Sequence, residues 1–398
     1  MSFCRRKAEA LALECSLSGM SNPGQSWVMI VPFFKPAPGG CGVYIDTIAR
    51  GLAKKGDRVL VITERHPAAP RREVLEGTEG RVLILREFPF RAGRARKDWL
   101  SLIAYFITNI SYLKLPGIVL QWASQENSAL RTLIHTSLFY NPNSLKRVVE
   151  KLRLNSSSTL IADVRDMQFP DAEIHLLDRF DRIVTSSHGV AEDLARRGAS
   201  PNKITPIPMP FTFPPVPEAC TVQATLEKHG LTGKRFLLNP NGISRAKLYV
   251  EMREAMPLIR SMPEMQDVEL VSVGRDRDRT DKDNEVERSG SARFLGPIPR
   301  EELLSLMRAA MFTLILSPNE AISRAALEAM AVGGRVILPD VAEFRVECAS
   351  HICTDPTPAN IARMVTKLAD AATPRFGFER HLEPNYLPLY RALHKVCN

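Results

Sequence analysis

The chain has 398 residues, of which 44% are hydrophobic and 24% charged, and this is ordinary globular composition. A length near 400 residues excludes a single hydrophobic core and fits two domains of usual size. The net charge of +9 indicates an anionic partner, such as nucleotide phosphates, nucleic acid or an anionic membrane surface, unless the basic surface is simply solvated.

Neither the cysteines nor the histidines form a recognisable metal or disulfide pattern. The seven cysteines are scattered without a C-x2-C pair, and the eight histidines lack an H-E-x-x-H motif. This distribution argues against a disulfide framework and a zinc site, and it favours a reducing, cytoplasmic location. We therefore expect no bound metal.

The chain is expected to begin with a loosely ordered tail, residues 1–25, that carries no secretory signal. The first structured unit is then a strand at 27–34, a helix at 43–55 with apolar residues at helical spacing, and a strand at 58–63. Together these segments have the length of a βαβ crossover.

Two segments after this unit bear on membrane contact. Residues 91–97 form a basic cluster, and residues 99–113 form an uncharged apolar run that is too short to span a bilayer. A soluble helix is expected for the apolar run, with an interfacial helix as the alternative. The basic cluster either contacts acidic lipid headgroups at the inner face of the membrane or forms a solvated face.

Strands and helices alternate along the rest of the first half. The expected elements are strands at 117–122, 159–163, 182–186 and 204–207 and a helix at 188–197. A proline-dense stretch follows at 206–217. Because proline removes backbone donors and disfavours a preceding helix, this stretch is the natural domain boundary.

The second half repeats the alternation. Its expected elements are strands at 235–239, 268–273, 312–316 and 335–338, helices at 247–260, 301–310, 324–332, 358–371 and 380–394, and a charged loop at 275–288. Alternation of this kind indicates an α/β fold with parallel sheets covered on both faces. We expect two Rossmann-like domains facing across a cleft, at 26–210 and 211–378, and a C-terminal helical segment at 379–398 that can cross back to the first domain.

Glycines stand between the first expected strand and helix, at Gly39, Gly40 and Gly42. Glycine lets the backbone approach a ligand closely, and the N–H groups at a helix start point toward it. The run lacks the full G-x-G-x-x-G pattern, so a nicotinamide site is weakly supported. A phosphate or acceptor loop and a plain tight turn both fit.

Two glutamates in the second half are separated by seven residues, Glu320 before an expected helix and Glu328 within it. Ser323 is the expected N-cap and Arg324 follows it. A helix N-terminus attracts a diphosphate, and carboxylates accept hydrogen bonds from hydroxyl groups. The segment therefore fits the two ends of a nucleotide sugar, whereas a surface loop with a solvent-facing glutamate is the simpler alternative.

Two cations follow a glycine in another strand–loop–helix connection, at Gly242, Arg245 and Lys247. Because cations are unfavourable at a helix start unless an anion is present, this pattern favours a phosphate clamp. Two solvated basic side chains are the alternative.

Acidic residues occur in two further places. Asp163, Arg165 and Asp166 end a strand, where they form either a general base or hydroxyl-binding group, or a structural Asp–Arg pair. Residues 276–283 contain D-x-D, which can bind a divalent metal with phosphates. Interleaved cations favour a solvated loop there.

From about residue 27 to 395 the chain resembles the GT-B fold glycosyltransferases of the large retaining family 4. The motifs that carry the resemblance are the G-G-x-G loop with its helix, DRIVTSSHGVAEDL at 181–194, VELVSVG at 268–274, the segment 292–320, and E-x7-E followed by A-M-A-x-G at 329–333.

The resemblance implies a role for each candidate residue. Glu320 would contact the donor sugar near the reacting centre, and Glu328 would bind the ribose. Arg245 and Lys247 would stabilise the leaving diphosphate, and Asp166 would lie on the acceptor side. Catalysis would rest on electrostatic support of a departing nucleoside diphosphate, with retention and without a metal.

The sequence departs from the family pattern at three places: Gly242-Ile243 replaces Gly-Arg, Ile322-Ser323 replaces Phe-Gly, and Met209-Pro210 replaces Asn-Gly. The expected function is transfer of a sugar from a UDP- or GDP-sugar to a saccharide or lipid-linked acceptor in polysaccharide or glycoconjugate synthesis. A non-catalytic partner subunit and a sugar-nucleotide epimerase on the same fold are the alternatives.

Overall fold

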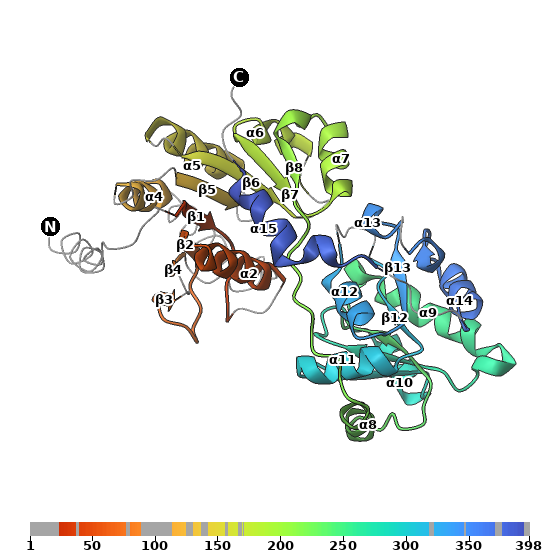
Figure 1. Cartoon of the computed structure of the whole chain (residues 1–398). Coiled ribbons are helices and arrows are strands. Elements are labelled where there is room, and N and C mark those ends of the chain that lie inside the picture. The colour runs from red at the N-terminus through yellow and green to blue at the C-terminus, as the bar shows by residue number, and fades with distance from the viewer. Residues whose placement is uncertain are drawn as a thin grey trace.

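The computed structural model describes most of the chain from Gly24 to Leu393, in the ranges 24–36, 40–76, 80–88, 114–124, 130–136, 142–155, 158–165, 169, 171–317, 322–345, 348–370 and 376–393. Two mainly parallel sheets with helices packed on them make up the molecule (Figure 1). The predicted α/β fold with two parallel-sheet halves is therefore confirmed.

The N-terminal half is built on a sheet with the order β3-β4-β2-β1-β5-β6-β7-β8, in which the one antiparallel pair within the described residues is β3 with β4. Its strands are β1 (Ser26–Ile30), β2 (Arg58–Glu64), β3 (Arg72–Glu76), β4 (Arg81–Phe88), β5 (Leu130–His135), β6 (Thr159–Val164), β7 (Arg182–Thr185) and β8 (Ile204–Pro206). Central strands such as β1 are buried along their whole length, as expected for parallel strands covered on both faces.

Helices α2 (Gly40–Lys54), α4 (Leu115–Ala123), α5 (Pro142–Asn155), α6 (Ile174–Leu177) and α7 (His188–Arg196) belong to this half. Helix α2 buries Ile45, Ile48 and Leu52, which follow helical spacing. It starts at Gly40, three residues before the predicted start, so the glycines occupy its first turn.

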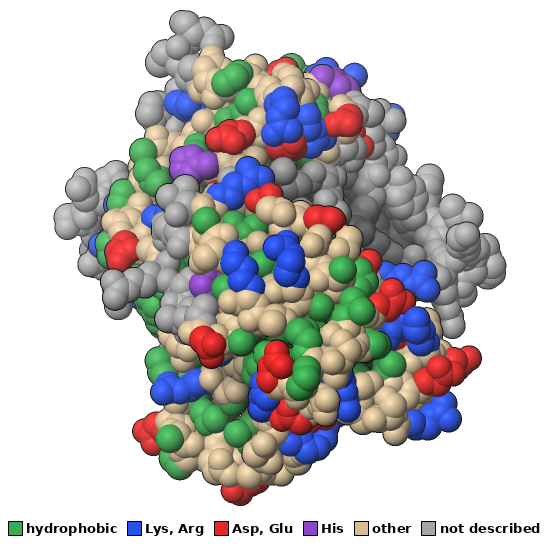
Figure 2. All heavy atoms as spheres, turned by 90° about the vertical axis from the view of Figure 1, so that its right-hand side faces the viewer, with side chains coloured by type: hydrophobic (Ala, Val, Ile, Leu, Met, Phe, Trp, Pro, Cys, Tyr) green, Lys and Arg blue, Asp and Glu red, His purple; other side chains and the backbone are tan. Residues whose placement is uncertain are grey.

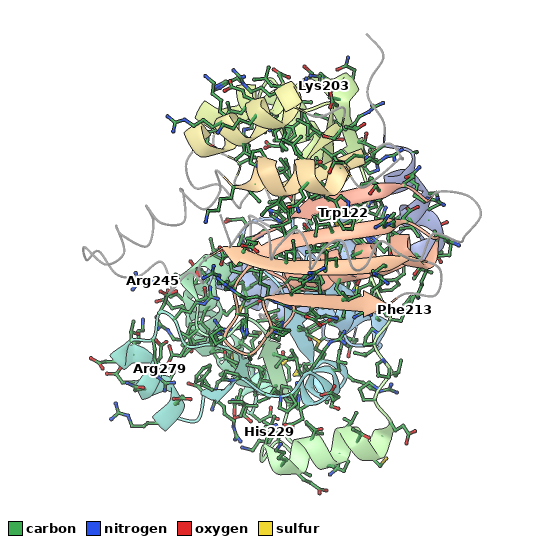
Figure 3. The ribbon with its side chains drawn as sticks, turned by 90° about the vertical axis from the view of Figure 1, so that its left-hand side faces the viewer. Trp122, Lys203, Phe213, His229, Arg245 and Arg279 are labelled. Carbon is green, nitrogen blue, oxygen red and sulfur yellow. The ribbon has the colours of Figure 1, made fainter. Side chains whose placement is uncertain are left out.

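The predicted strand at 117–122 is wrong, because this segment forms helix α4. Pro116 lies in the first turn, where a missing N–H costs nothing. Leu115, Val119 and Trp122 are buried at helical spacing, and the Trp122 indole donates to Ser26 Oγ at 3.2 Å (Figure 3). The basic cluster at 91–97 and the apolar run at 99–113 lie outside the described residues.

The C-terminal half has a second sheet, with the order β11-β10-β9-β12-β13-β14 and parallel pairing throughout the described strands. These strands are β9 (Phe236–Asn239), β10 (Glu269–Val273), β11 (Ala292–Gly296), β12 (Phe312–Leu314), β13 (Val336–Pro339) and β14 (Ile352–Cys353). The helices are α8 (Ala219–Lys228), α9 (Tyr249–Arg260), α10 (Asp281–Arg288), α11 (Arg300–Ala309), α12 (Arg324–Ala331), α13 (Ala342–Arg345) and α14 (Pro358–Lys367).

The basic side chains that the structure describes do not form a single patch on the side of the molecule that carries the C-terminal half. Figure 2 shows Lys and Arg side chains interspersed there with Asp and Glu side chains. In the described part of the chain, no helix combines the length and the apolar composition that crossing a bilayer requires.

Two chain segments connect the halves, and they are tied to each other. The outgoing segment follows β8, and the returning one contains a short 3₁₀ turn, Glu379–His381. The Phe211 N–H donates to the His381 carbonyl at 2.9 Å, and His381 Nδ1 lies 2.8 Å from the Met209 carbonyl. The Phe211 and Phe378 rings stack with centroids 5.4 Å apart. The proline-dense stretch is thus one side of a double connection.

A further contact joins the halves directly. The buried Glu343 of α13 accepts a hydrogen bond at 2.6 Å from the backbone N–H of His188, at the start of α7. A carboxylate is favourable at that position because the helix dipole is positive there.

The C-terminal helix α15 (Glu383–Arg391) returns to the N-terminal half, where it packs beside α2 (Figure 1). Buried Arg131 of β5 donates through Nε to the Leu393 carbonyl at 2.6 Å and through Nη2 to the Arg391 carbonyl at 3.4 Å. Arg391 in turn contacts the fully buried Asp57 at 3.2 Å. Arg131 therefore satisfies carbonyls that the helix end leaves open.

We predict that Arg131→Met lowers the free energy of unfolding by about 1.5–3 kcal/mol, because hydrogen bonds from a buried cation to the helix end are lost. Urea unfolding followed by circular dichroism measures the change. The control is Arg196→Met, whose side chain is 71% exposed and pairs only at the surface, and which should change stability by less than about 0.5 kcal/mol. Equal unfolding midpoints for the two variants would contradict the assignment.

Candidate functional site

The candidate donor site lies at the carboxyl edge of the C-terminal sheet, where the loops after β9 and β12 meet. These two strands are parallel neighbours, with Phe312 opposite Leu237. At the end of β12 the Ser317 hydroxyl contacts the Ala246 carbonyl at 3.4 Å, between Arg245 and Lys247. The structure therefore brings the predicted cation pair next to the loop that leads into the E-x7-E segment.

Arg245 and Lys247 form a short 3₁₀ turn between β9 and α9. Arg245 is exposed, and its side chain has no ion pair within the described part of the chain; Figure 3 shows it on the same side of the C-terminal half as Arg279. The next residue, Leu248, adopts the left-handed conformation with φ of 57°, which costs roughly 1–2 kcal/mol for a side chain that carries a Cβ. Strain of this kind often occurs at functional loops.

Gly242 has a packing role that the sequence did not indicate. Its φ is 68°, and a Cβ there would lie 2.2 Å from the Arg275 carbonyl oxygen. The Ile243 N–H donates to the same carbonyl at 3.1 Å, and the Arg245 N–H donates to Asp278 Oδ2 at 2.8 Å. The glycine thus allows the loop after β9 to cross the loop after β10, which holds the cation turn in place.

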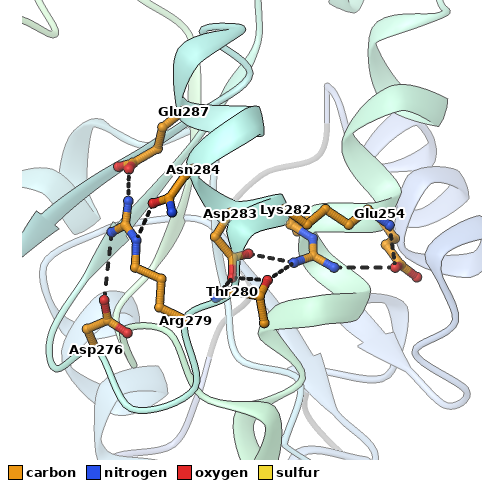
Figure 4. A network of polar contacts seen from close by, with 9 residues as sticks. Glu254, Asp276, Arg279, Thr280, Lys282, Asp283, Asn284 and Glu287 are labelled. Carbon is orange, nitrogen blue, oxygen red and sulfur yellow. Dashed lines mark hydrogen bonds and ion pairs between the residues drawn. The ribbon is translucent and has the colours of Figure 1, made fainter.

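The segment predicted as a charged loop is in part a helix, α10, with a capping box. The Asp283 carboxylate accepts from the Thr280 N–H at 2.6 Å and from its hydroxyl at 2.7 Å, and it pairs with Arg253 at 2.5 Å (Figure 4). Asp283 and Arg253 are both buried, so a fully solvated loop is wrong for this aspartate.

Other acids of the same segment also bind cations of the protein. Arg279 contacts Asp276 and Glu287, and Lys282 contacts Glu254 at 3.1 Å (Figure 4). Within the described residues no group of three or more His, Cys, Asp or Glu side chains is arranged to hold a metal ion. The D-x-D residues that the structure describes serve to fix the loop after β10.

Helix α12 starts at Arg324, directly after Ser323. Ser323 is the predicted N-cap, but its side chain makes no capping hydrogen bond. Among the described residues, no N-cap side chain therefore satisfies the first N–H groups of α12, and such groups bind anions. Glu320 lies outside the described residues.

Glu328 lies within α12 with only 11% of its side chain exposed. Its Oε1 atom accepts hydrogen bonds from two arginines, from Arg300 Nη2 at 2.8 Å and from Arg324 Nη2 at 3.5 Å. Burial lowers the pKa of Arg324, and the neighbouring Glu328 charge opposes that shift. Arg300 is not among the candidates predicted from the sequence, although a cation at the first position of a helix was a usable signal.

In the N-terminal half a buried polar network joins three elements. Asp163 at the end of β6 accepts from the Tyr44 hydroxyl of α2 and pairs with Arg165, which also donates to the Tyr390 hydroxyl of α15. The Arg165 guanidinium lies 4.6 Å from the centroid of the Tyr44 ring. The structural Asp–Arg pair is thus the correct interpretation of Asp163, which is fully buried and has both carboxylate oxygens engaged.

The network also controls protonation near the glycine loop. Burial, and after it the Asp163 charge, raises the pKa of the Cys41 thiol to about 12, and burial likewise raises the pKa of Tyr390 to about 12. Both groups are therefore neutral near pH 7, and Cys41 is a poor nucleophile.

The predicted acceptor-side residues are only partly described. Gly40 and Gly42 lie in the first turn of α2, and a Cβ at Gly42 would approach the Phe34 Cα to 3.2 Å. Close packing against the chain after β1 thus explains a glycine at this position. Gly39 and Asp166 lie outside the described residues.

Comparison with protein families gives two matches. Residues 38–211 match the model described as Glycosyltransferase Family 4, and residues 244–371 match the model described as Glycosyl transferases group 1. A search of curated protein sequences finds no significant match.

Several solved structures are similar over almost the whole chain. HepE from Anabaena, solved with UDP, has a TM-score of 0.61 at 14% identity, with 92% of this chain and 94% of that chain covered. Sucrose-phosphate synthase from Thermosynechococcus elongatus has a TM-score of 0.64 at 17% identity, covering 93% and 94%. The UDP-forming α,α-trehalose-phosphate synthase from Burkholderia vietnamiensis has a TM-score of 0.62 at 15% identity, covering 92% and 98%.

We predict that Arg253→Met destabilises the protein by about 3–5 kcal/mol at neutral pH, because it leaves the Asp283 carboxylate buried without its partner. Burial alone would raise the pKa of Asp283, but hydrogen bonds from Thr280 and Arg253 lower it. Because the pKa of Asp283 is lower in the folded state, its ionised carboxylate stabilises the fold at pH above its unfolded-state pKa, near 3.9. This stabilisation is lost as the pH falls through the folded-state pKa.

Urea unfolding between pH 2 and pH 7 tests this assignment. The difference between wild type and Arg253→Met should shrink as pH falls below the unfolded-state pKa near 3.9 and through the lowered folded-state pKa of Asp283. The control is Lys282→Met, whose side chain is 59% exposed and which should show a small difference at every pH. A difference for Arg253→Met that does not depend on pH would contradict the assignment.

Proposed function

Because this chain belongs to the GT-B glycosyltransferases, we propose that it moves a sugar from a UDP- or GDP-sugar to a saccharide or lipid-linked acceptor, with retention and without a metal. The observation that carries the proposal is the contact between Ser317 and Ala246. It puts two cations, a helix start without a side-chain cap, and Glu328 on neighbouring loops and helices at one edge of the sheet.

The diphosphate of the donor fits the N-terminus of α12. The N–H groups there and the guanidinium of Arg245 provide positive charge from two elements. Lys247 lies in the same turn as Arg245. Positive charge that is fixed before the reaction stabilises the negative charge that develops on a leaving nucleoside diphosphate, and this needs no metal.

Glu328 and Glu320 are proposed to bind the ribose and the sugar of the donor, respectively. Glu328 is held on α12 by two arginines and is proposed to accept hydrogen bonds from the ribose hydroxyls. Glu320 is proposed to contact the transferred sugar; this role rests on its place in the E-x7-E pattern, eight positions before Glu328 and shortly after Ser317.

Uridine is the base that the similar structures favour. HepE was solved with UDP and also with UDP-glucose, and the Burkholderia enzyme is described as UDP-forming. We therefore place UDP-sugars ahead of GDP-sugars as donors of this chain.

The acceptor is proposed to bind on the N-terminal half, at the start of α2. Gly39, Gly40 and Gly42 would face the acceptor or the donor phosphate, and Asp166 would lie close to them as the acceptor-side acid. Buried Tyr44, Asp163 and Arg165 fix the first turn of α2 against the end of β6, which gives this surface a defined shape. The pathway is proposed to be polysaccharide or glycoconjugate synthesis at the inner face of the membrane.

We predict that Glu320→Ala lowers donor turnover by about 100-fold or more, since electrostatic support at the reacting centre is lost. Turnover is measured as release of nucleoside diphosphate, and circular dichroism checks that the fold is intact. The control is Glu301→Ala, an exposed glutamate in the first turn of α11, which should leave turnover unchanged. Full turnover by Glu320→Ala would contradict the proposed role.

A thermal-shift screen against UDP, GDP, ADP and their sugars, with and without EDTA, tests the donor class. We expect UDP to stabilise the protein by about 2.7 kcal/mol at 100 times its dissociation constant, and EDTA to leave the shift unchanged. Stabilisation by none of the nucleotides would favour a non-catalytic partner subunit. Conversion of a UDP-sugar without any acceptor would favour an epimerase.

A further inference from the structure

We propose that Arg300 is a positioning residue of the donor site, which holds one carboxylate oxygen of Glu328 and thereby presents the other oxygen to the ribose. This inference rests on the proposed function, in which Glu328 binds the ribose hydroxyls. It assigns a role to a residue outside the E-x7-E segment, at the start of a different helix.

The contacts of Glu328 are asymmetric. Arg300 and Arg324 both reach Oε1, at 2.8 and 3.5 Å, whereas Oε2 has no hydrogen bond or ion pair within the described residues. Arg300 comes from α11 and Arg324 from the first turn of α12, so the oxygen is held from two directions. A carboxylate anchored in this way keeps its second oxygen in a fixed position.

Two carboxylates that stabilise the fold of the same half are used differently. Asp283 has Arg253 on Oδ1 and Thr280 on Oδ2, and Glu302 has Lys228 on Oε1 and His229 on Oε2. Each of them uses both oxygens. The single-oxygen contact at Glu328 therefore suits an acid that must still accept a ligand.

Burial supports the same conclusion. The Glu328 side chain is 11% exposed, Arg324 is 24% exposed, and Arg300 is 49% exposed. An exposed ion pair adds little to stability, so a purely structural role would give Arg300 little effect on anything measured. A glutamate whose rotamer is fixed before binding loses less conformational entropy when the ribose arrives. The effect of Arg300 should therefore appear in ligand binding.

The test measures binding of UDP and 2′-deoxy-UDP, and of the corresponding guanosine nucleotides, by calorimetry to wild type, Arg300→Met and Arg300→Lys. We expect Arg300→Met to weaken UDP binding about tenfold and 2′-deoxy-UDP binding much less, because the lost interaction acts through the ribose hydroxyl. Arg300→Lys should restore part of the preference for ribose, since it keeps a cation near Oε1.

The matched control is Arg308→Met on the same helix, where the exposed Arg308 side chain makes no hydrogen bond or ion pair with another described residue. It should bind both nucleotides as wild type does. Equal weakening of UDP and 2′-deoxy-UDP by Arg300→Met, or no weakening, would overturn the inference and leave the proposed function intact. A wild-type protein that binds none of the nucleotides would overturn both.

Discussion

The parallel pairing of β12 with β9 is the constraint on which the candidate donor site depends. Neighbouring strands lie about 4.8 Å apart, so loops that leave their carboxyl ends must meet. Ser317 and Ala246 make that contact here. The cation turn and the start of α12 are brought together by the sheet order, although more than seventy residues separate them in sequence. Gly242 lets the loop after β9 cross the loop after β10, and this crossing keeps the cation turn in place.

Three acids of this protein differ in how many of their carboxylate oxygens accept hydrogen bonds or ion pairs. Asp163 and Asp283 are buried and have both oxygens engaged, so they hold elements together and offer nothing to a ligand. Glu328 is almost as buried but engages only one oxygen. Burial alone therefore does not identify a functional acid.

Sequence patterns predicted the two-sheet architecture, because buried parallel strands that alternate with helices leave strong local signals. The donor-site residues stay a prediction. The patterns failed where tertiary packing decides the outcome. Residues 117–122 have the composition of a strand, but Pro116 and the burial of Trp122 make them a helix. The network of Tyr44, Arg165 and Tyr390 joins residues up to 346 positions apart, and no local pattern could reveal it. The pairing of Arg300 with Glu328 was hidden for the same reason, since the two residues lie on different helices, although a cation at a helix start gave a local hint.

Because a chain is synthesised from its N-terminus, the return of α15 to the N-terminal half affects when that half can complete its packing. Arg131 and Arg165 are buried in the first half, but their partners Leu393 and Tyr390 are synthesised after the whole second half. A growing chain on the ribosome therefore carries a first half whose internal cations still lack these hydrogen-bond acceptors. The final packing of the first half must therefore wait for the last helix of the chain.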